Sequence, residues 1–357
     1  MYPDPTQLQH HQPTTNMSTT IFITGATGYI GGSVLAALLE NKSYKISALV
    51  RSEDKAKKLK DLGVEPLIGT LDSADLITTA AKEHDVTIEV ADCDHLGEAQ
   101  AIIAGLKQKL QETGKKGIYI QTSGTGILSD TANGQFVSDK IYSDADTASL
   151  TALPESQPHR HVDTVLVREA FSYTLAMITP PCIYGEGTGA FNRRSIQIPL
   201  VIRSAIERRK TPQVGDGKNV WSNVHIKDLV PVYTILLSKL LSDNPEVMKN
   251  TGEAGYWFAE TGQHNWGEVS QFVAKKLHAL GAVDDEKVYP KHTEQEVIDG
   301  FGFKEAMYFT GGNSRCVAEK TRKVLGWKPE LDSEEEVWKY VEWECEKMFK
   351  EHQEKKQ

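Results

Sequence analysis

Near its start the chain reads Ile21-Phe22-Ile23-Thr24-Gly25-Ala26-Thr27-Gly28-Tyr29-Ile30-Gly31-Gly32. A short apolar run, rich in β-branched residues, leads into glycines at positions 25, 28 and 31. The next apolar residues recur at helical spacing, as Val34, Leu35, Leu38 and Leu39. This order predicts a strand, a tight turn and a helix.

The glycine spacing of this turn is typical of dinucleotide binding. Gly25 permits the turn, Gly28 lets a pyrophosphate approach the backbone, and Gly31 lets the helix lie close to the strand. Because no Lys or Arg precedes Lys42, the free N–H groups of the helix N-terminus would supply the attraction. The alternative is an ordinary glycine-rich turn. We expect the cofactor to contact Gly25, Ala26, Thr27, Gly28, Tyr29, Ile30 and Gly31.

The end of the second expected strand, residues 45–50, indicates which dinucleotide binds. An NAD site usually has Asp or Glu here, to accept hydrogen bonds from the ribose 2′-hydroxyl. This chain has Val50 and Arg51, followed by Lys55 in the next helix. A guanidinium can donate two parallel hydrogen bonds to a 2′-phosphate, so we predict NADP(H) rather than NAD. The alternative is that Arg51 only begins a solvated basic helix face.

The composition fits a cytoplasmic enzyme. The 357 residues are 39% hydrophobic and 25% charged, enough for a full core. A net charge of −9 argues against a nucleic-acid partner, and no apolar run reaches the roughly 18 residues of a membrane span. The four cysteines have no metal-site spacing. Asp92, Asp94 and His95 could bind a metal ion only with a further ligand that the sequence does not identify, so we expect no metal.

Alternating β and α patterns continue to about residue 180, which predicts an α/β fold with a Rossmann-type, doubly wound parallel sheet. The expected strands are 20–24, 45–50, 64–68, 86–91, 117–122 and 173–179. We predict a disordered tail at 1–19, an NADP-binding domain at 20–185 with a long loop at 126–160, and a smaller α/β substrate lobe. This lobe spans mainly 186–350, with some segments returning to the first domain. Residues 333–350 have the pattern of a capped helix.

Several segments in chain order resemble the extended short-chain dehydrogenases/reductases, in particular the atypical proteins known as NAD-dependent epimerase/dehydratase-like. The resemblance covers about residues 20–348. It rests on the glycine turn, Gly69-Thr70-Leu71-Asp72, Val90-Ala91, Tyr119-Ile120-Gln121-Thr122-Ser123-Gly124, Pro180-Pro181-Cys182-Ile183-Tyr184-Gly185, Trp221 to Leu229, and Leu325-Gly326-Trp327-Lys328-Pro329. It implies cofactor contacts by Leu71, Asp72, Ala91, Thr122, Pro181 and Ile183, and a catalytic serine at Ser123.

The chain departs from this family at the proton donor, a tyrosine followed four residues later by lysine. No tyrosine in this sequence has lysine at that spacing. His161 or His159 could replace the tyrosine, because histidine titrates near neutral pH. Tyr142 or Tyr184 could reach in from another segment, or the protein does no proton chemistry. We predict Ser123, His161 and Tyr184 as catalytic residues.

The expected function is NADP(H)-dependent reduction of a carbonyl, or oxidation of an alcohol, in a small or medium-sized molecule. The alternatives are a non-redox isomerase, lyase or cyclase that retains NADP, and a regulatory protein that senses NADP. We expect a small-molecule substrate and no association with a membrane. A homodimer is a further possibility. Arg193, Arg194 and Arg203 could meet an anionic substrate, and Trp221, Trp257 and Trp266 could form an aromatic wall or core.

Overall fold

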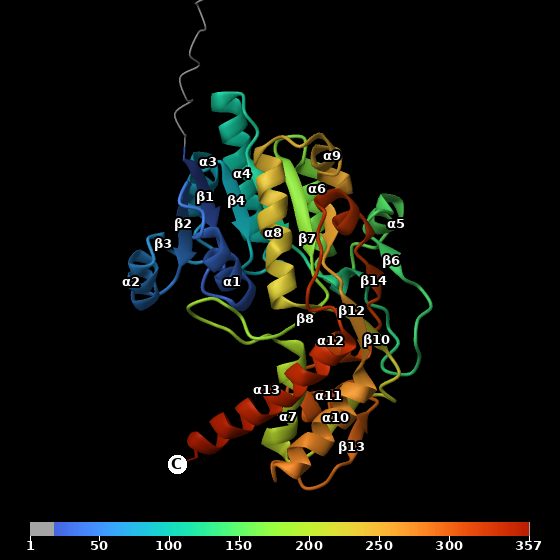
Figure 1. Ribbon diagram of the computed structural model, residues 1–357. Helices are drawn as coiled ribbons and strands as arrows, with labels where there is room; N and C mark the ends of the chain where they lie inside the picture. Colours follow the sequence, from blue (N-terminus) through green and yellow to red (C-terminus); the bar gives the residue numbers. More distant parts are fainter. Residues whose placement is uncertain (1–17, 357) are drawn as a thin grey trace, which may run out of the picture.

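The computed structural model describes residues 18–356, so the tail predicted at residues 1–19 lies almost entirely outside the described part. The larger part of the molecule is built on a seven-stranded sheet in which all neighbouring strands run parallel (Figure 1). The strand order is β11 (Tyr256–Phe258), β7 (Thr174–Thr179), β5 (Ile118–Thr122), β4 (Val86–Glu89), β1 (Thr19–Ile23), β2 (Tyr44–Val50) and β3 (Glu65–Ile68). This order confirms the predicted Rossmann-type sheet.

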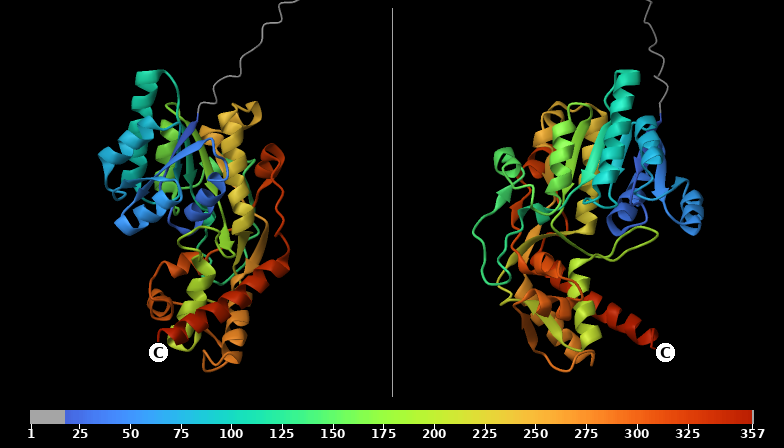
Figure 2. Two further views of the ribbon diagram at one scale, coloured as in Figure 1. Left: turned by 60° about the vertical axis from the view of Figure 1, so that its left-hand side comes forward. Right: turned by 180° about the vertical axis from the view of Figure 1, so that it is seen from behind.

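Helices cover both faces of the sheet (Figure 2). On one face α1 contacts α8, and on the other α4 packs between α3 and α6. Burial on both sides explains why strands such as β1 read as continuous apolar runs. The helices of this part are α1 (Tyr29–Leu38), α2 (Glu53–Asp61), α3 (Ala74–Glu83), α4 (Leu96–Thr113), α6 (Arg160–Glu169) and α8 (Ile226–Leu241). The short α2 lies beside β3.

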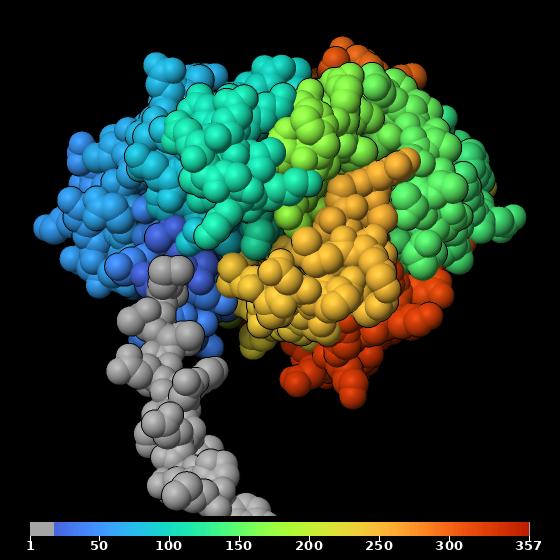
Figure 3. All heavy atoms as spheres, turned by 90° about the horizontal axis from the view of Figure 1, so that it is seen from above, coloured from blue at the N-terminus to red at the C-terminus, as the bar shows by residue number. Residues whose placement is uncertain are grey.

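The six strands expected from the sequence all form, within two residues of the predicted bounds. The sequence did not predict β11, which has three residues and lies in the chain between segments of the second lobe. It completes the sheet by pairing with β7. Seen from above, the gold segment that leads into β11 lies between residues of the amino-terminal half and the carboxyl-terminal segment (Figure 3).

The second lobe has a hydrophobic cluster of its own, which includes Trp266, Phe301 and Tyr340. The capped helix predicted from residue 333 is α13, which is four residues longer than expected and projects from the lobe (Figure 1). The elements are β8 (Cys182–Tyr184), α7 (Gln197–Arg208), β9 (Thr211–Val214), β10 (Val220–His225), β12 (Gly262–Asn265), α10 (Trp266–Ala279), β13 (Val288–Lys291), α11 (Glu294–Phe301), α12 (Ala306–Gly311) and α13 (Glu334–Glu354). Three further short segments are α9 (Pro245–Met248) and two 3-10 turns, Thr125–Leu128 and Gly252–Ala254.

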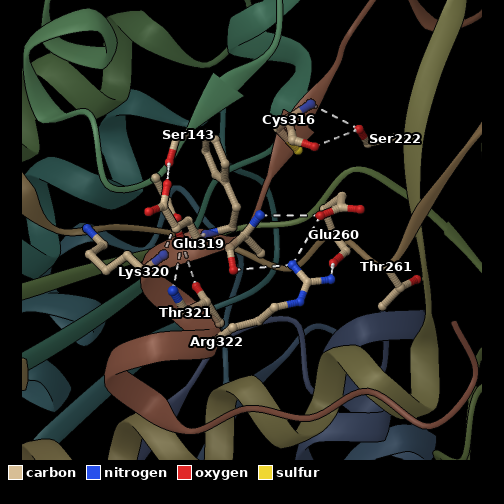
Figure 4. Close-up of polar contacts among 12 residues, drawn as sticks. Ser143, Ser222, Glu260, Thr261, Cys316, Glu319, Lys320, Thr321 and Arg322 are labelled. Carbon is tan, nitrogen blue, oxygen red and sulfur yellow. Dashed lines mark hydrogen bonds and ion pairs between the residues drawn. The ribbon is translucent and has the colours of Figure 1, made fainter.

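The predicted long loop at 126–160 carries β6 (Tyr142–Ser143) and α5 (Thr147–Thr151) and is held by the carboxyl-terminal segment. β6 pairs in parallel with β14 (Cys316–Val317), which leads into a π-helical turn at Thr321–Leu325. Figure 4 shows the contacts beside this pairing: Ser143 donates to Glu319 (3.0 Å), and Arg322 donates to the Glu260 carboxylate (3.1 Å). The loop is therefore built into the fold by tertiary contacts.

Asp144 is the buried centre of this attachment. Its carboxylate accepts hydrogen bonds from the backbone N–H groups of Lys320 (2.7 Å), Thr321 (3.0 Å) and Phe258 (3.2 Å). We expect Asp144→Ala to lower the free energy of unfolding by about 3 kcal/mol, because these buried donors lose their acceptor. Urea denaturation would measure the loss. The control is Asp146→Ala, which removes an exposed helix cap and should cost clearly less than the loss of the buried Asp144. Equal losses would contradict the central role of Asp144.

None of the helices in the described range combines the length and the apolar composition needed to cross a membrane. The four cysteines all lie in this range and form no disulfide with one another.

Candidate active site

A cavity of about 470 Å³ lies where the carboxyl ends of the sheet strands meet the second lobe. Its sheet side is formed by the glycine turn and by the segments that follow β4, β5 and β7. Its other side comes from the second lobe and includes Ile196, Trp221 and Phe309. Of the residues predicted to bind the cofactor, those that line the cavity are Gly28, Tyr29, Ile30, Ala91, Thr122, Pro181 and Ile183.

The glycine turn has the geometry that its spacing predicted. A β-carbon on Gly25 would lie 2.4 Å from the Val90 carbonyl oxygen, and one on Gly31 would lie 2.2 Å from the Gly25 carbonyl oxygen. One on Gly28 would have only the Gly25 oxygen as a neighbour, at 3.1 Å. Gly28 therefore faces open space at the N-terminus of α1, where no side chain caps the helix. An anion such as a pyrophosphate fits this position.

The expected adenosine end of the site lies beyond the cavity lining. Arg51 is exposed at the end of β2, and Ser52 precedes α2 without capping it through its side chain. Lys55 brings its ammonium group to 3.4 Å from the Thr27 hydroxyl. Asp72, which with Leu71 follows β3, is exposed and lies 3.3 Å from His95. The basic groups near the glycine turn thus come from the end of β2 and the start of α2.

Ser123 lies at the end of β5, lines the cavity and belongs to a buried polar network. Its hydroxyl donates to Asp163 on α6 at 3.0 Å, and Tyr256 donates to the same carboxylate oxygen at 3.2 Å. The buried Arg160 in turn donates to the Tyr256 hydroxyl. Burial raises the pKa of Asp163 to about 6, although the bond from Ser123 opposes the shift. Within the described residues, the second oxygen of Asp163 has no partner.

His159 is the histidine that lines the cavity. Its Nδ1 lies 2.9 Å from the Asp94 carboxylate and 3.2 Å from the Cys93 sulfur. Its Nε2 lies against Gly124 and Gly126, where a β-carbon on Gly126 would approach to 2.8 Å, and forms no hydrogen bond within residues 18–356. The imidazole is therefore held at Nδ1 and free at Nε2.

Two further observations set His159 apart. Its φ of +66° is a left-handed conformation that a non-glycine residue adopts at a cost of about 1–3 kcal/mol, and such residues gather at functional sites. Burial disfavours the charge of Asp94, but the hydrogen bond and charge of His159, with the charge of His161, hold its pKa below the usual range. An ionised Asp94 can stabilise a protonated imidazole at Nδ1.

Two of the residues predicted to be catalytic, His161 and Tyr184, lie outside the cavity lining. His161 is half exposed, its Nε2 lies 3.1 Å from the Asp94 carbonyl oxygen, and it does not line the cavity. Tyr184 is buried and donates to the Leu331 carbonyl at 3.1 Å, because alternation along β8 turns it away while Ile183 faces the cavity. Burial also raises the pKa of Tyr184 far above its usual range. Tyr142, the other tyrosine considered, lies in β6, outside the lining.

Cys93, Asp94 and His159 are close enough to hold a metal ion, with one donor atom of each within 4.8 Å of the others. This combination was not apparent from the sequence, because His159 is distant in the chain from Cys93 and Asp94. Burial, followed by the charge of Asp94, raises the pKa of the Cys93 thiol, which favours the neutral form. Contacts of His159 Nδ1 with the Asp94 carboxylate and the Cys93 sulfur hold the three side chains together.

This architecture is that of a two-lobed α/β protein built around a nucleotide cofactor. Residues 17–109 match the NmrA-like family. The oxidase ucsJ of an Acremonium species is 31% identical over 88% of this chain and 93% of its own. The chain belongs to the extended short-chain dehydrogenase/reductase family.

Solved structures of the same fold share little sequence with this chain. A dTDP-glucose 4,6-dehydratase from Bacillus anthracis, in complex with NAD, has a TM-score of 0.63 at 16% identity, over 91% of this chain and 96% of its own. The yeast methylglyoxal/isovaleraldehyde reductase Gre2, in complex with NADPH, has a TM-score of 0.59 at 14% identity, over 92% of this chain and 99% of its own. With the family, these similarities support an oxidoreductase-type enzyme with a nicotinamide cofactor.

Proposed function

We propose that the protein is an NADP(H)-dependent oxidoreductase that reduces a carbonyl group, or oxidises an alcohol, in a small or medium-sized molecule. The observation that carries the proposal is the free Nε2 of His159 in the cavity that also contains Ser123 and Gly28. When bound, the nicotinamide supplies or accepts a hydride. The open space at Gly28 and the uncapped N-terminus of α1 fit its pyrophosphate.

In this proposal His159 takes the place of the tyrosine of the family. During reduction, protonated His159 gives the proton on Nε2 to the substrate oxygen, and Asp94 stabilises the charged imidazole through Nδ1. During oxidation the same nitrogen accepts the proton. His161 and Tyr184 are not assigned this role, because neither lines the cavity.

Ser123 holds the substrate oxygen only when its proton is available. Its hydroxyl donates to Asp163 when that carboxylate is ionised. When Asp163 is protonated, the carboxylic acid can donate to Ser123, and Ser123 can then donate to the substrate. Since the pKa of Asp163 is raised to about 6, this form is favoured below that pH. The network therefore favours carbonyl reduction in mildly acidic solution.

The preference for NADP(H) is proposed from the basic groups beside the glycine turn. Arg51, the Ser52 hydroxyl and Lys55 can all approach a 2′-phosphate at the start of α2. Glu53 and Asp54 in the first turn of α2 oppose this attraction, so the two cations have to outweigh them. The expected preference is correspondingly moderate.

Arg51→Ala tests this preference. We expect the wild-type protein to bind NADPH at least tenfold more tightly than NADH, and the variant to lose most of that difference. A factor of ten corresponds to about 1.4 kcal/mol, which a charge-assisted hydrogen bond can supply. Fluorescence titration with both cofactors measures the two affinities. Lys57→Ala, in the helix that follows Arg51, is the control with the same loss of charge. Equal wild-type affinities for NADPH and NADH would exclude the assignment.

The NmrA-like match favours a second candidate function, a protein that senses NADP and signals through a partner. That match covers residues 17–109 only, the cofactor side of the molecule. Turnover separates the candidates, because an oxidoreductase consumes NADPH with an added carbonyl compound. A sensor, or an isomerase that retains NADP, does not. A cytoplasmic location and a possible homodimer remain parts of the proposal.

A further inference from the structure

The second-lobe side of the cavity presents mostly carbon to a ligand, because its polar side chains are already engaged within the protein. Trp221 donates its indole N–H to the Gly312 carbonyl at 2.7 Å. Gln197 donates its amide to the Phe309 carbonyl at 2.9 Å, and Ser195 is bonded to Tyr340 at 3.1 Å. The Trp221 ring, the Phe309 ring and Ile196, which is 73% exposed, are the large apolar groups of this side.

Within the described residues, lysine and arginine are missing from the cavity lining, so the second-lobe side carries no positive charge. No Lys or Arg of residues 18–356 is among the lining residues, whereas Asp92 is. Arg194 is bound by Glu344 and Glu351, and Arg193 by the Gly187 carbonyl and Glu186. These arginines, which the sequence suggested for an anionic substrate, are therefore committed to structural contacts. An anion would lose its hydration at this wall without gaining a cation.

The polar groups proposed to contact the substrate lie on the sheet side of the cavity, where Ser123 is bound to Asp163 and His159 keeps its Nε2 without a hydrogen bond in the described residues. Besides Ser123 and His159, the side includes Thr125, whose buried hydroxyl has no partner within the described residues. A ligand that matches this distribution has one polar group facing the sheet and an apolar body facing the second lobe. The cavity thus fixes the orientation as well as the class of ligand.

We propose that the substrate is a neutral carbonyl compound with an aromatic or aliphatic body, which packs against Trp221, Phe309 and Ile196. This inference rests on the proposed oxidoreductase function and specifies its substrate class. The carbonyl oxygen lies towards Ser123 and His159. A substrate with a carboxylate or a diphosphate next to the apolar wall is rejected, because no cation receives it.

A pair of ketones that differ in one charge tests the inference. We expect NADPH-dependent reduction of 4-phenyl-2-butanone to have a kcat/KM at least 100-fold higher than that of 4-(3-oxobutyl)benzoate, the same ketone with a carboxylate on the ring that faces the wall. Along the 2-alkanones from 2-butanone to 2-octanone, kcat/KM should rise roughly fourfold for each buried methylene. A higher kcat/KM for the carboxylate than for 4-phenyl-2-butanone would overturn the inference and leave the proposed redox function standing. Tighter binding of UDP-glucose than of 4-phenyl-2-butanone would do the same.

Three variants locate the wall. Phe309→Ala should raise the KM for 4-phenyl-2-butanone at least tenfold and leave the Kd for NADPH within twofold. Tyr308→Ala is the control, since Tyr308 is the neighbouring exposed aromatic residue and does not line the cavity. Ile196→Arg should raise kcat/KM for the carboxylate about tenfold by supplying the missing cation. Unchanged kinetics in both Phe309→Ala and Ile196→Arg would contradict the assigned wall.

Binding measurements distinguish the inference from the proposed function. Calorimetry with protein saturated with NADP⁺ should detect 4-phenyl-2-butanone and a loss of affinity in Phe309→Ala. If the ketone binds in this way without any turnover with NADPH, the redox proposal fails and the substrate class stands. If 4-phenyl-2-butanone neither binds nor reacts while the carboxylate does, the substrate class is wrong.

Discussion

Gly28→Val should abolish NADPH binding and leave the protein folded. The φ of −83° and ψ of −177° at Gly28 are open to any residue, so valine introduces no backbone strain. Its β-carbon approaches only the Gly25 carbonyl, and its methyl groups extend into the space proposed for the pyrophosphate. We expect the Kd for NADPH to rise at least 100-fold in a fluorescence titration, with the melting temperature lowered by only a few degrees.

Two neighbouring glycines supply controls for this variant. A β-carbon on Gly32 meets its nearest atoms at 3.5 Å, so Gly32→Ala should fold and bind NADPH normally. Gly31→Ala should lose stability as well as binding, because its β-carbon collides with the Gly25 backbone. Normal NADPH binding by a folded Gly28→Val protein would show that the glycine turn does not hold the cofactor.

The sheet was predictable from the sequence to the extent that its signals are local. The turn at Gly25 to Gly31 lies within one strand–helix unit, and its backbone determines which residues fit. β11 carries no such signal, since its three residues join the sheet only by pairing with β7, far earlier in the chain. The attachment of the 126–160 loop likewise depends on the distant Lys320 and Thr321, which bind Asp144.

The catalytic candidates were less predictable because their identity depends on side-chain direction. His159 and His161 are two residues apart at the start of α6, and the sequence did not distinguish them. Only the left-handed backbone of His159 and its contact with Asp94 show which ring enters the cavity. Asp163 was visible in the sequence as an acidic helix residue, but its bond to Ser123 follows from the packing of α6 on β5.

The pH dependence of carbonyl reduction should reflect both His159 and Asp163. A histidine that donates a proton is active only when protonated, so loss of that proton at rising pH should lower the rate. Ionisation of Asp163, whose pKa is raised to about 6, withdraws the Ser123 proton and lowers the rate in the same direction. Asp163→Asn separates the two effects, since the inflection that persists in this variant belongs to His159.

His159→Phe should lower kcat for carbonyl reduction by about 10²–10⁴, the usual contribution of general acid catalysis. It should also remove the inflection that Asp163→Asn retains, because no imidazole then faces the cavity. The Kd for NADPH should stay within twofold, since the glycine turn and Arg51 hold the cofactor independently. His161→Phe is the matched control, two residues away and outside the lining, and should retain kcat within threefold.

A chelator should leave the wild-type rate unchanged if His159 acts through hydrogen bonds to Asp94 rather than through a metal. Full activity in His159→Phe would assign the proton to another group and leave Ser123 as the remaining catalytic candidate in the cavity.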